Sequence, residues 1–230
     1  MTLVMAHRGS SKAEPENTLA AFLRARQDGA DLVELDVRLT VDGALAVVHD
    51  PLLGDGRVVA ETDSFDLPDH IPLLDAALEA CVGLVVNVEI KSSPREPGFD
   101  PTRRAADVLV EVLAARGGKD QVIVSSFDLE VIDRVRALAP EVETAYLVSF
   151  IANHAKLVDL LVARGHRGVH PWHLLVNRRL VARCHAAGLA VRPWTVDDPD
   201  RIVRLAALGV DAICTNVPAV AASLLRAGPG

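Results

Sequence analysis

The chain has 230 residues, of which 50% are hydrophobic and 24% charged. A chain of this length can bury a full core and is close to the ~250 residues typical of a one-domain α/β barrel, so we expect one domain over residues 1–230. The formal net charge is −7 and the basic residues are scattered along the sequence, which argues against nucleic acid as a partner.

Short runs rich in Val, Ile and Leu alternate with longer stretches of helical periodicity. This alternation is typical of parallel strands joined by crossover helices. The predicted strands are, in chain order, Leu3–Ala6, Leu32–Val37, Leu84–Ile90, Val122–Ser125, Thr144–Val148, Gly168–His170, Ala190–Trp194 and Ala212–Thr215. Eight strands is the number that closes a barrel, so the pattern predicts an α/β fold of the (β/α)₈ type.

Helical periodicity appears between these strands and after the last one. The predicted helices are Thr18–Asp28, Leu73–Ala80, Thr102–Ala115, Leu129–Leu138, His154–Ala163, Arg178–Ala187, Pro199–Ala207 and Pro218–Leu225. An open doubly wound sheet is the competing architecture. We favour the barrel because no glycine-rich dinucleotide loop follows the first strand, where residues 6–9 read Ala-His-Arg-Gly.

The stretch from Arg38 to Asp50 departs from the alternation. Asp42 and Gly43 form a turn signal, and Ala44–Val48 is again strand-like. We therefore expect a short hairpin extension of the second strand, which would lift His49 toward the barrel mouth.

Cysteine usage and the apolar runs indicate the compartment. The three cysteines, Cys81, Cys184 and Cys214, show neither zinc-site nor CxxC spacing, so we expect buried, reduced thiols. The first ten residues lack a signal-peptide pattern, and no apolar run approaches the ~20 residues that span a bilayer. We expect no integral membrane segment and a cytoplasmic location.

Polar residues stand where the strands end, which is where barrel enzymes carry their working groups. Glu34 and Asp36 are two residues apart, so both carboxylates point to one face of a strand. With Glu89 on the neighbouring strand, three carboxylates would converge and repel one another, which predicts a divalent cation with oxygen ligands. The alternative is an internal ion-pair network in which Lys91 or Arg8 neutralises these groups.

Two histidines, His7 and His49, lie beside this acidic cluster in the predicted fold. Cleavage of a phosphodiester requires one group to take a proton and another to give one, and histidine titrates near neutral pH. A lone histidine at a strand end is commonly a satisfied polar residue, but two beside carboxylates favour an acid/base pair. The sequence leaves open which histidine is the acid.

Several motifs, in this order and spacing, resemble the glycerophosphodiester phosphodiesterase family. In the first half they are His7-Arg8-Gly9, Glu16-Asn17-Thr18, Glu34-Leu35-Asp36-Val37, Thr40-Val41-Asp42-Gly43, Val48-His49-Asp50 and Glu89-Ile90-Lys91. The resemblance continues through Ser125-Ser126-Phe127-Asp128, Ala186-Ala187-Gly188-Leu189, Trp194-Thr195-Val196-Asp197-Asp198 and the stretch from Asp211 to Pro218. It covers nearly the whole chain.

The resemblance implies a TIM barrel in which Glu34, Asp36 and Glu89 hold Mg²⁺ or Ca²⁺. It implies that His7 and His49 are the general acid/base pair, and that Arg8 and Lys91 face the phosphate. The implied substrate is a small glycerophosphodiester, cleaved to sn-glycerol 3-phosphate and an alcohol by water or by a substrate hydroxyl.

Further residues are expected around the pocket. We expect Ser126, Phe127 and Trp194 to line its mouth, although core packing is the alternative for the tryptophan. Asn17 and Asn216 are expected to hold loops through hydrogen bonds to the backbone, and Asp42 and Asp50 to be structural.

One segment departs from the family pattern. Leu52–His70 is short and lacks the usual Leu-x-Arg-Thr-Thr stretch, so the preferred alcohol is not readable from the sequence. A lysophospholipase D-type activity on lipid diesters and a non-catalytic phosphate-binding barrel are the alternative functions. The sequence does not distinguish Mg²⁺ from Ca²⁺, and it does not give the oligomeric state.

Overall fold

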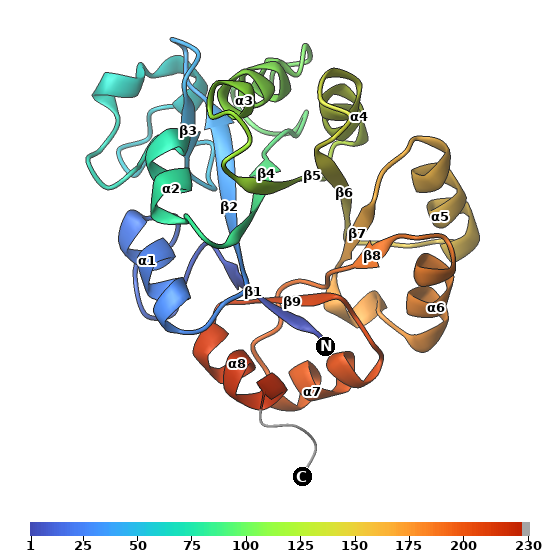
Figure 1. Cartoon of the computed structure of the whole chain (residues 1–230). Coiled ribbons are helices and arrows are strands. Elements are labelled where there is room, and N and C mark those ends of the chain that lie inside the picture. Colours follow the sequence, from blue (N-terminus) through green and yellow to red (C-terminus); the bar gives the residue numbers. More distant parts are fainter. Residues whose placement is uncertain (227–230) are drawn as a thin grey trace.

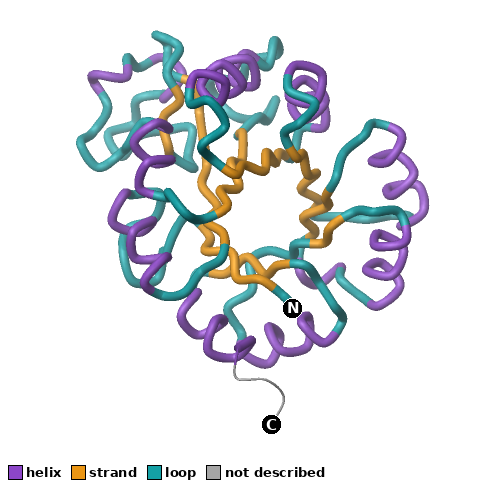
Figure 2. Tube along the Cα trace, viewed as in Figure 1, coloured by secondary structure: helices purple, strands orange, loops and turns teal. Residues whose placement is uncertain are grey.

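A computed structural model describes residues 1–226 and shows a ring of strands surrounded by helices (Figure 1, Figure 2). The parallel strands are β1 (Leu3–His7), β2 (Leu32–Leu39), β4 (Val85–Ile90), β5 (Gln121–Ser126), β6 (Glu143–Val148), β7 (Gly168–Pro171), β8 (Ala190–Val191) and β9 (Ala212–Thr215). They are ordered β8-β7-β6-β5-β4-β2-β1-β9. Because the first strand pairs with the last, the predicted barrel is confirmed and the open doubly wound sheet is wrong.

The remaining seam of the barrel lies between β8 and β9. Backbone hydrogen bonds cross it, from Asp211 N–H to Val191 O and from Cys214 N–H to Pro193 O, each 2.9 Å long. Strand β8 ends earlier than the predicted Ala190–Trp194, because Pro193 has no N–H to give to a ladder. The barrel is therefore nearly closed and has one short strand.

Helices follow the strands and form the outer ring in Figure 2. They are α1 (Leu19–Gln27), α2 (Leu74–Ala80), α3 (Arg104–Ala115), α4 (Leu129–Leu138), α5 (His154–Ala163), α6 (Arg178–Ala186), α7 (Pro199–Ala207) and α8 (Pro218–Arg226). Side-chain caps fix several starts; Asp198, for example, accepts from Arg201 N–H at the start of α7. The helix predictions are confirmed, with ends that differ by at most two residues.

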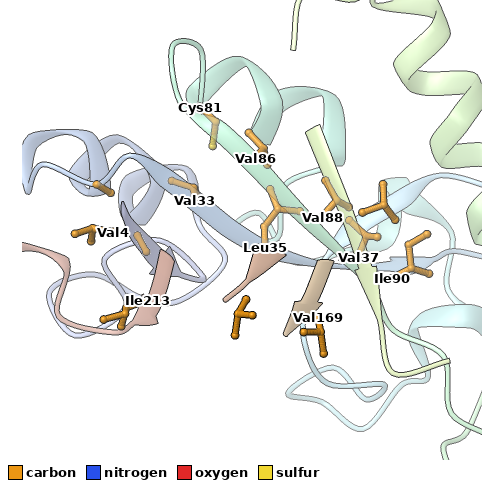
Figure 3. Close-up of a cluster of buried hydrophobic side chains, with 14 of the residues drawn as sticks. Val4, Val33, Leu35, Val37, Cys81, Val86, Val88, Ile90, Val169 and Ile213 are labelled. Carbon is orange, nitrogen blue, oxygen red and sulfur yellow. The ribbon is translucent and has the colours of Figure 1, made fainter. Parts of the chain in front are cut away.

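The main core lies between the outer face of the barrel and the helices. Successive side chains of a strand point to opposite faces, so Val33, Leu35 and Val37 of β2 face outward together. Figure 3 shows these residues gathered with Val86, Val88 and other apolar side chains of neighbouring elements. All five are at most 1% exposed. Burial of each such side chain stabilises the fold by roughly 1.5–3 kcal/mol.

The hairpin extension is confirmed as β3 (Leu45–Val47), which pairs antiparallel with the end of β2. Gly43 has a φ of 87° in the connecting turn, where the Thr40 hydroxyl donates to Asp42. Short 3₁₀ helices that the sequence did not indicate follow at Val59–Glu61 and Ser64–Asp66, and a third lies at His173–Leu175.

All three cysteines are free and buried, as expected. Burial raises the pKa of Cys81 to about 12, so its thiol stays protonated. Among the described residues, no helix combines the length and apolar character needed to cross a bilayer.

Candidate active site

Three buried carboxylates converge at the C-terminal ends of β2 and β4. Glu34 and Asp36 point inward from β2, and Glu89 stands beside Asp36 on β4, in direct register. One oxygen from each of the three lies within 4.8 Å of the others. Their exposed fractions are 4%, 1% and 8%, so water does not screen their repulsion effectively. The predicted convergence is confirmed.

The three carboxyl groups have different electrostatic surroundings. Burial, followed by the charges of Asp36 and Glu89, raises the pKa of Glu34 well above its usual value. Burial, followed by the charge of Asp36, raises the pKa of Glu89 to about 7. Burial also acts on Asp36, but Lys91 and Arg8 outweigh it and lower the pKa of that carboxyl. Without a further positive charge, the site therefore resists ionisation of all three groups.

Two basic side chains partly neutralise the acidic cluster. The Lys91 ammonium lies 2.7 Å from Glu89 Oε1 and 3.5 Å from Asp36 Oδ1. Arg8 Nε lies 3.1 Å from Asp36 Oδ2, and Arg8 Nη1 lies 2.8 Å from Glu16 Oε1. The ion-pair network that we considered as an alternative is thus present.

This network does not satisfy every buried oxygen. Glu34 Oε1 and Asp36 Oδ1 have no hydrogen-bond donor among the described residues. Buried carboxylate oxygens without donors are costly, and hard divalent cations take such oxygens as ligands. The donor set of Glu34, Asp36 and Glu89 therefore fits Mg²⁺ or Ca²⁺ better than it fits a site closed by ion pairs alone.

The loop after β1 adopts an unusual backbone conformation that serves this cluster. Arg8 and Asn17 have φ values of 55° and 57°, a left-handed region that side chains other than glycine rarely adopt. In this conformation Arg8 N–H donates to Glu34 Oε2 over 2.8 Å, and Asn17 Nδ2 donates to Asp36 Oδ2 over 2.9 Å. Gly9 is required here, because a Cβ would lie 2.6 Å from Ala21.

His7 is held by the residue that follows the last strand of the barrel, β9. Its Nδ1 lies 2.7 Å from Asn216 Oδ1, and its Nε2 lies 4.0 Å from Glu34 Oε2. The amide of Asn216 is oriented by Asp197, which accepts from Nδ2 over 2.7 Å. Because an amide oxygen only accepts, His7 carries its proton on Nδ1 and leaves Nε2 free. Burial and the Arg8 charge lower the pKa of His7.

His49 lies at the end of the hairpin extension and has different partners. Its Nδ1 is 2.7 Å from Asp50 Oδ1, so Asp50 orients the ring of His49. The main-chain oxygen of His49 accepts from Arg38 Nε over 2.8 Å, and Arg38 is paired in turn with Glu96 at 2.9 Å. A buried arginine thereby ties the His49 loop to the segment that follows β4.

A cavity of about 130 Å³ joins these groups, and both histidines, Arg8, Glu34, Glu89 and Lys91 line it. Phe127 and Trp194 form part of its wall, with ring centroids 5.4 Å apart in an edge-to-face contact. Ser126 does not reach the cavity, contrary to the expectation. It is fully buried and donates to Ile90 O, because alternation turns it away from the side to which Phe127 points.

Besides Thr195, which follows Trp194, three polar residues that the sequence reasoning missed also line the cavity: Asn87, His170 and Arg192. Each lies in or directly after a strand, at an inward position where an apolar residue is ordinary. Asn87 stands two residues before Glu89, so the same alternation that grouped the carboxylates could have identified it. Asn17 and Asn216 contact site side chains and not only loop backbone.

Comparisons with known proteins agree with this geometry. The model of the glycerophosphoryl diester phosphodiesterase family matches residues 7–70 and 56–220. The chain is 33% identical to a glycerophosphodiester phosphodiesterase of Caldanaerobacter subterraneus, over 99% of both chains. It is 32% identical to one of Bacillus altitudinis, over 95% of this chain and 96% of the other.

Solved structures show the same barrel. An Oleispira antarctica phosphodiesterase in complex with the product sn-glycerol-3-phosphate is 28% identical, with a TM-score of 0.88 over 98% of this chain and 97% of the other. A glycerophosphodiester phosphodiesterase from Thermotoga maritima is 26% identical, with a TM-score of 0.81 over 96% of each chain.

Proposed function

This chain belongs to the glycerophosphoryl diester phosphodiesterase family, and we propose on that basis that it hydrolyses glycerophosphodiesters to sn-glycerol 3-phosphate and an alcohol. We take residues 1–230 as one catalytic domain. The observation that carries the proposal is a cluster of three buried carboxylates, two of which line one small cavity together with His7 and His49. A protein that only binds phosphate has no need of two groups able to transfer protons.

We assign Glu34, Asp36 and Glu89 as the residues that hold a divalent cation, Mg²⁺ or Ca²⁺. Bound there, the cation would neutralise phosphate charge and act as a Lewis acid. The oxygens without donors, on Glu34 and Asp36, support this assignment. Asn17 contributes by fixing one Asp36 oxygen, which leaves the other free to face the ion.

We assign the two proton transfers from the hydrogen bonds of the histidines. His7 is neutral near pH 7, because its pKa is lowered, and its free Nε2 is suited to take a proton from the attacking oxygen. His49 Nδ1 lies 2.7 Å from Asp50 Oδ1, a contact that orients the ring, and we assign His49 as the group that protonates the leaving alkoxide. His7 and His49 are thus assigned the two proton transfers of the reaction.

The basic and aromatic groups suit the two ends of a diester. Arg8 and Lys91 line the cavity and are positioned to contact phosphate oxygens while they remain paired with carboxylates. A guanidinium and an ammonium there would also stabilise the charge that develops in the transition state. Phe127 and Trp194 offer an apolar wall to the carbon skeleton of the substrate.

Product release by metal-stripped protein tests the proposed function. Glycerol 3-phosphate would be measured from glycerophosphocholine and glycerophosphoethanolamine, with Mg²⁺, Ca²⁺ or no metal added back. We expect turnover only with added cation. The absence of turnover on both substrates under every condition would reject the proposal, and turnover in a chelator would reject the cation assignment.

A further inference from the structure

The floor of the cavity contains a polar side chain to which the reaction above gives no role. Asn87 lies on β4 two residues before Glu89, points inward with it, and stands directly opposite Glu34 on β2. Its exposed fraction is 1%, yet it lines the cavity.

Only one end of the Asn87 amide is satisfied by the protein. Its Nδ2 donates to the Ser125 hydroxyl over 2.9 Å, and Ser125 itself is fully buried. Its Oδ1 is buried and has no donor among residues 1–226. Buried amide oxygens almost always have a donor, so an oxygen at a cavity wall without one indicates a ligand.

The chemistry of Asn87 Oδ1 limits which groups of a substrate can bind to it. An amide oxygen only accepts, and an ionised phosphodiester offers only acceptors, so the phosphate is not its partner. An ammonium group would meet the positive charges of Arg8 and Lys91 in the same cavity. Among the groups that a phosphodiester substrate can offer, a neutral hydroxyl remains, and a cavity of about 130 Å³ suits a small polyol.

We infer that Asn87 Oδ1 accepts a hydrogen bond from a hydroxyl of the glycerol group, and that this contact distinguishes polyol phosphates from simple alkyl phosphates. The inference rests on the proposed function for the identity of the polyol. An alkyl group in the same place would leave the buried oxygen unpaired, and such sites discriminate strongly against analogues that lack the hydroxyl.

Calorimetric titration of two phosphate monoesters tests the inference. Glycerol 3-phosphate and n-propyl phosphate share the phosphate and the carbon chain length, so the ratio of their Kd values isolates the hydroxyls. With Mg²⁺ present, we expect the wild-type protein to bind glycerol 3-phosphate about 10- to 100-fold more tightly. In Asn87→Leu, which keeps the side-chain volume, we expect the ratio to fall to about threefold or less.

Ser125→Ala is the matched second variant, and it is the variant to measure if Asn87→Leu does not fold. It removes the anchor of the Asn87 amide but leaves the oxygen, so we expect the wild-type ratio to fall only severalfold. A wild-type ratio near one would overturn the inference, as would an unchanged ratio in Asn87→Leu. A loss of Mg²⁺ affinity in Asn87→Leu would also overturn it, because Asn87 would then be a ligand of the cation.

The proposed function and this inference can fail separately. Absence of hydrolysis by the wild-type protein would reject the proposed function. The affinity ratio needs no turnover, so it would still decide whether Asn87 recognises the glycerol hydroxyls.

Discussion

The two faces of β2 and β4 differ beyond the first inward pair, Leu32 and Val85, although their residues alternate along the same backbone. The outward face is apolar and packs against helices, as Val33, Leu35 and Val37 do in Figure 3. The inward face presents Glu34 and Asp36; desolvation of both carboxylates is unfavourable, and only at Asp36 do the charges of Lys91 and Arg8 outweigh it. From Val33 to Val37, the direction of the side chain thus separates residues that stabilise the fold from residues that form the site.

The largest expected effect is on the inward side of the barrel. His7→Ala and His49→Ala should each lower kcat by ~10²- to 10⁴-fold, because each removes one proton transfer. The free energy of unfolding should change little. In the pH profile of kcat/KM, His7→Ala should remove the acidic limb, because the lowered pKa of His7 sets the pH below which this base is protonated. Full activity in either variant would remove that histidine from the mechanism, and an acidic limb that persists in His7→Ala would show that His7 is not the base.

Leu35→Ala examines the outward side, at the position between two carboxylates. Leu35 is fully buried, so the cavity left behind should lower the free energy of unfolding by about 2–5 kcal/mol. The folded protein should keep its kcat and its cation affinity. Denaturant titration and steady-state kinetics on the same preparation measure both quantities. A large loss of cation affinity with little loss of stability would show that the two faces are not separable.

The smallest effect expected is a pH dependence of stability in the cation-free protein. Burial raises the folded pKa of Glu89 to about 7 from 4.5, so the unfolded chain releases its proton first. Below about pH 4.5 the Glu89 carboxyl is protonated in both states and costs the folded protein nothing. As the pH rises to about 7, the free energy of unfolding falls by at most ~3 kcal/mol. Asp36 has the opposite sign, because its lowered pKa adds stability that is lost only at acid pH.

Chemical denaturation of chelator-treated protein at pH 5 and pH 8 measures this dependence. Glu89→Gln is the control, since it removes the titrating group while it keeps the size of the side chain. The wild-type protein should be more stable at pH 5, whereas the variant should show a smaller difference. In saturating Mg²⁺, the wild-type protein should no longer be less stable at pH 8 than at pH 5. Equal wild-type stability at both values would contradict the raised pKa of Glu89.

Most of the architecture could be predicted from the sequence, because the alternation of apolar strands and amphipathic helices is a local signal. The hairpin extension was predictable for the same reason, from the turn at Asp42 and Gly43. Strand β8 is shorter than predicted because Pro193 has no N–H to donate, so its ladder with β7 ends at Val191. The 3₁₀ helices between Val59 and Asp66 have no comparable periodicity.

The site was predictable where two residues share a face of one strand, as Glu34 and Asp36 do. It was less predictable where the contact joins distant elements. The tie from Arg38 to the backbone of His49 depends on how the hairpin folds back. The sequence analysis places both Ser126 and Phe127 at the mouth of the pocket, although alternation turns neighbouring side chains to opposite faces.

The hydrogen bond between His7 and Asn216 has a consequence for biosynthesis. The two residues are separated by 209 positions, and they meet only when β9 pairs with β1. A growing polypeptide therefore carries all three carboxylates and both histidines long before it can orient the first of them. Until residue 216 has left the ribosome and β9 has paired with β1, the nascent chain contains the site residues but His7 has no partner to orient it.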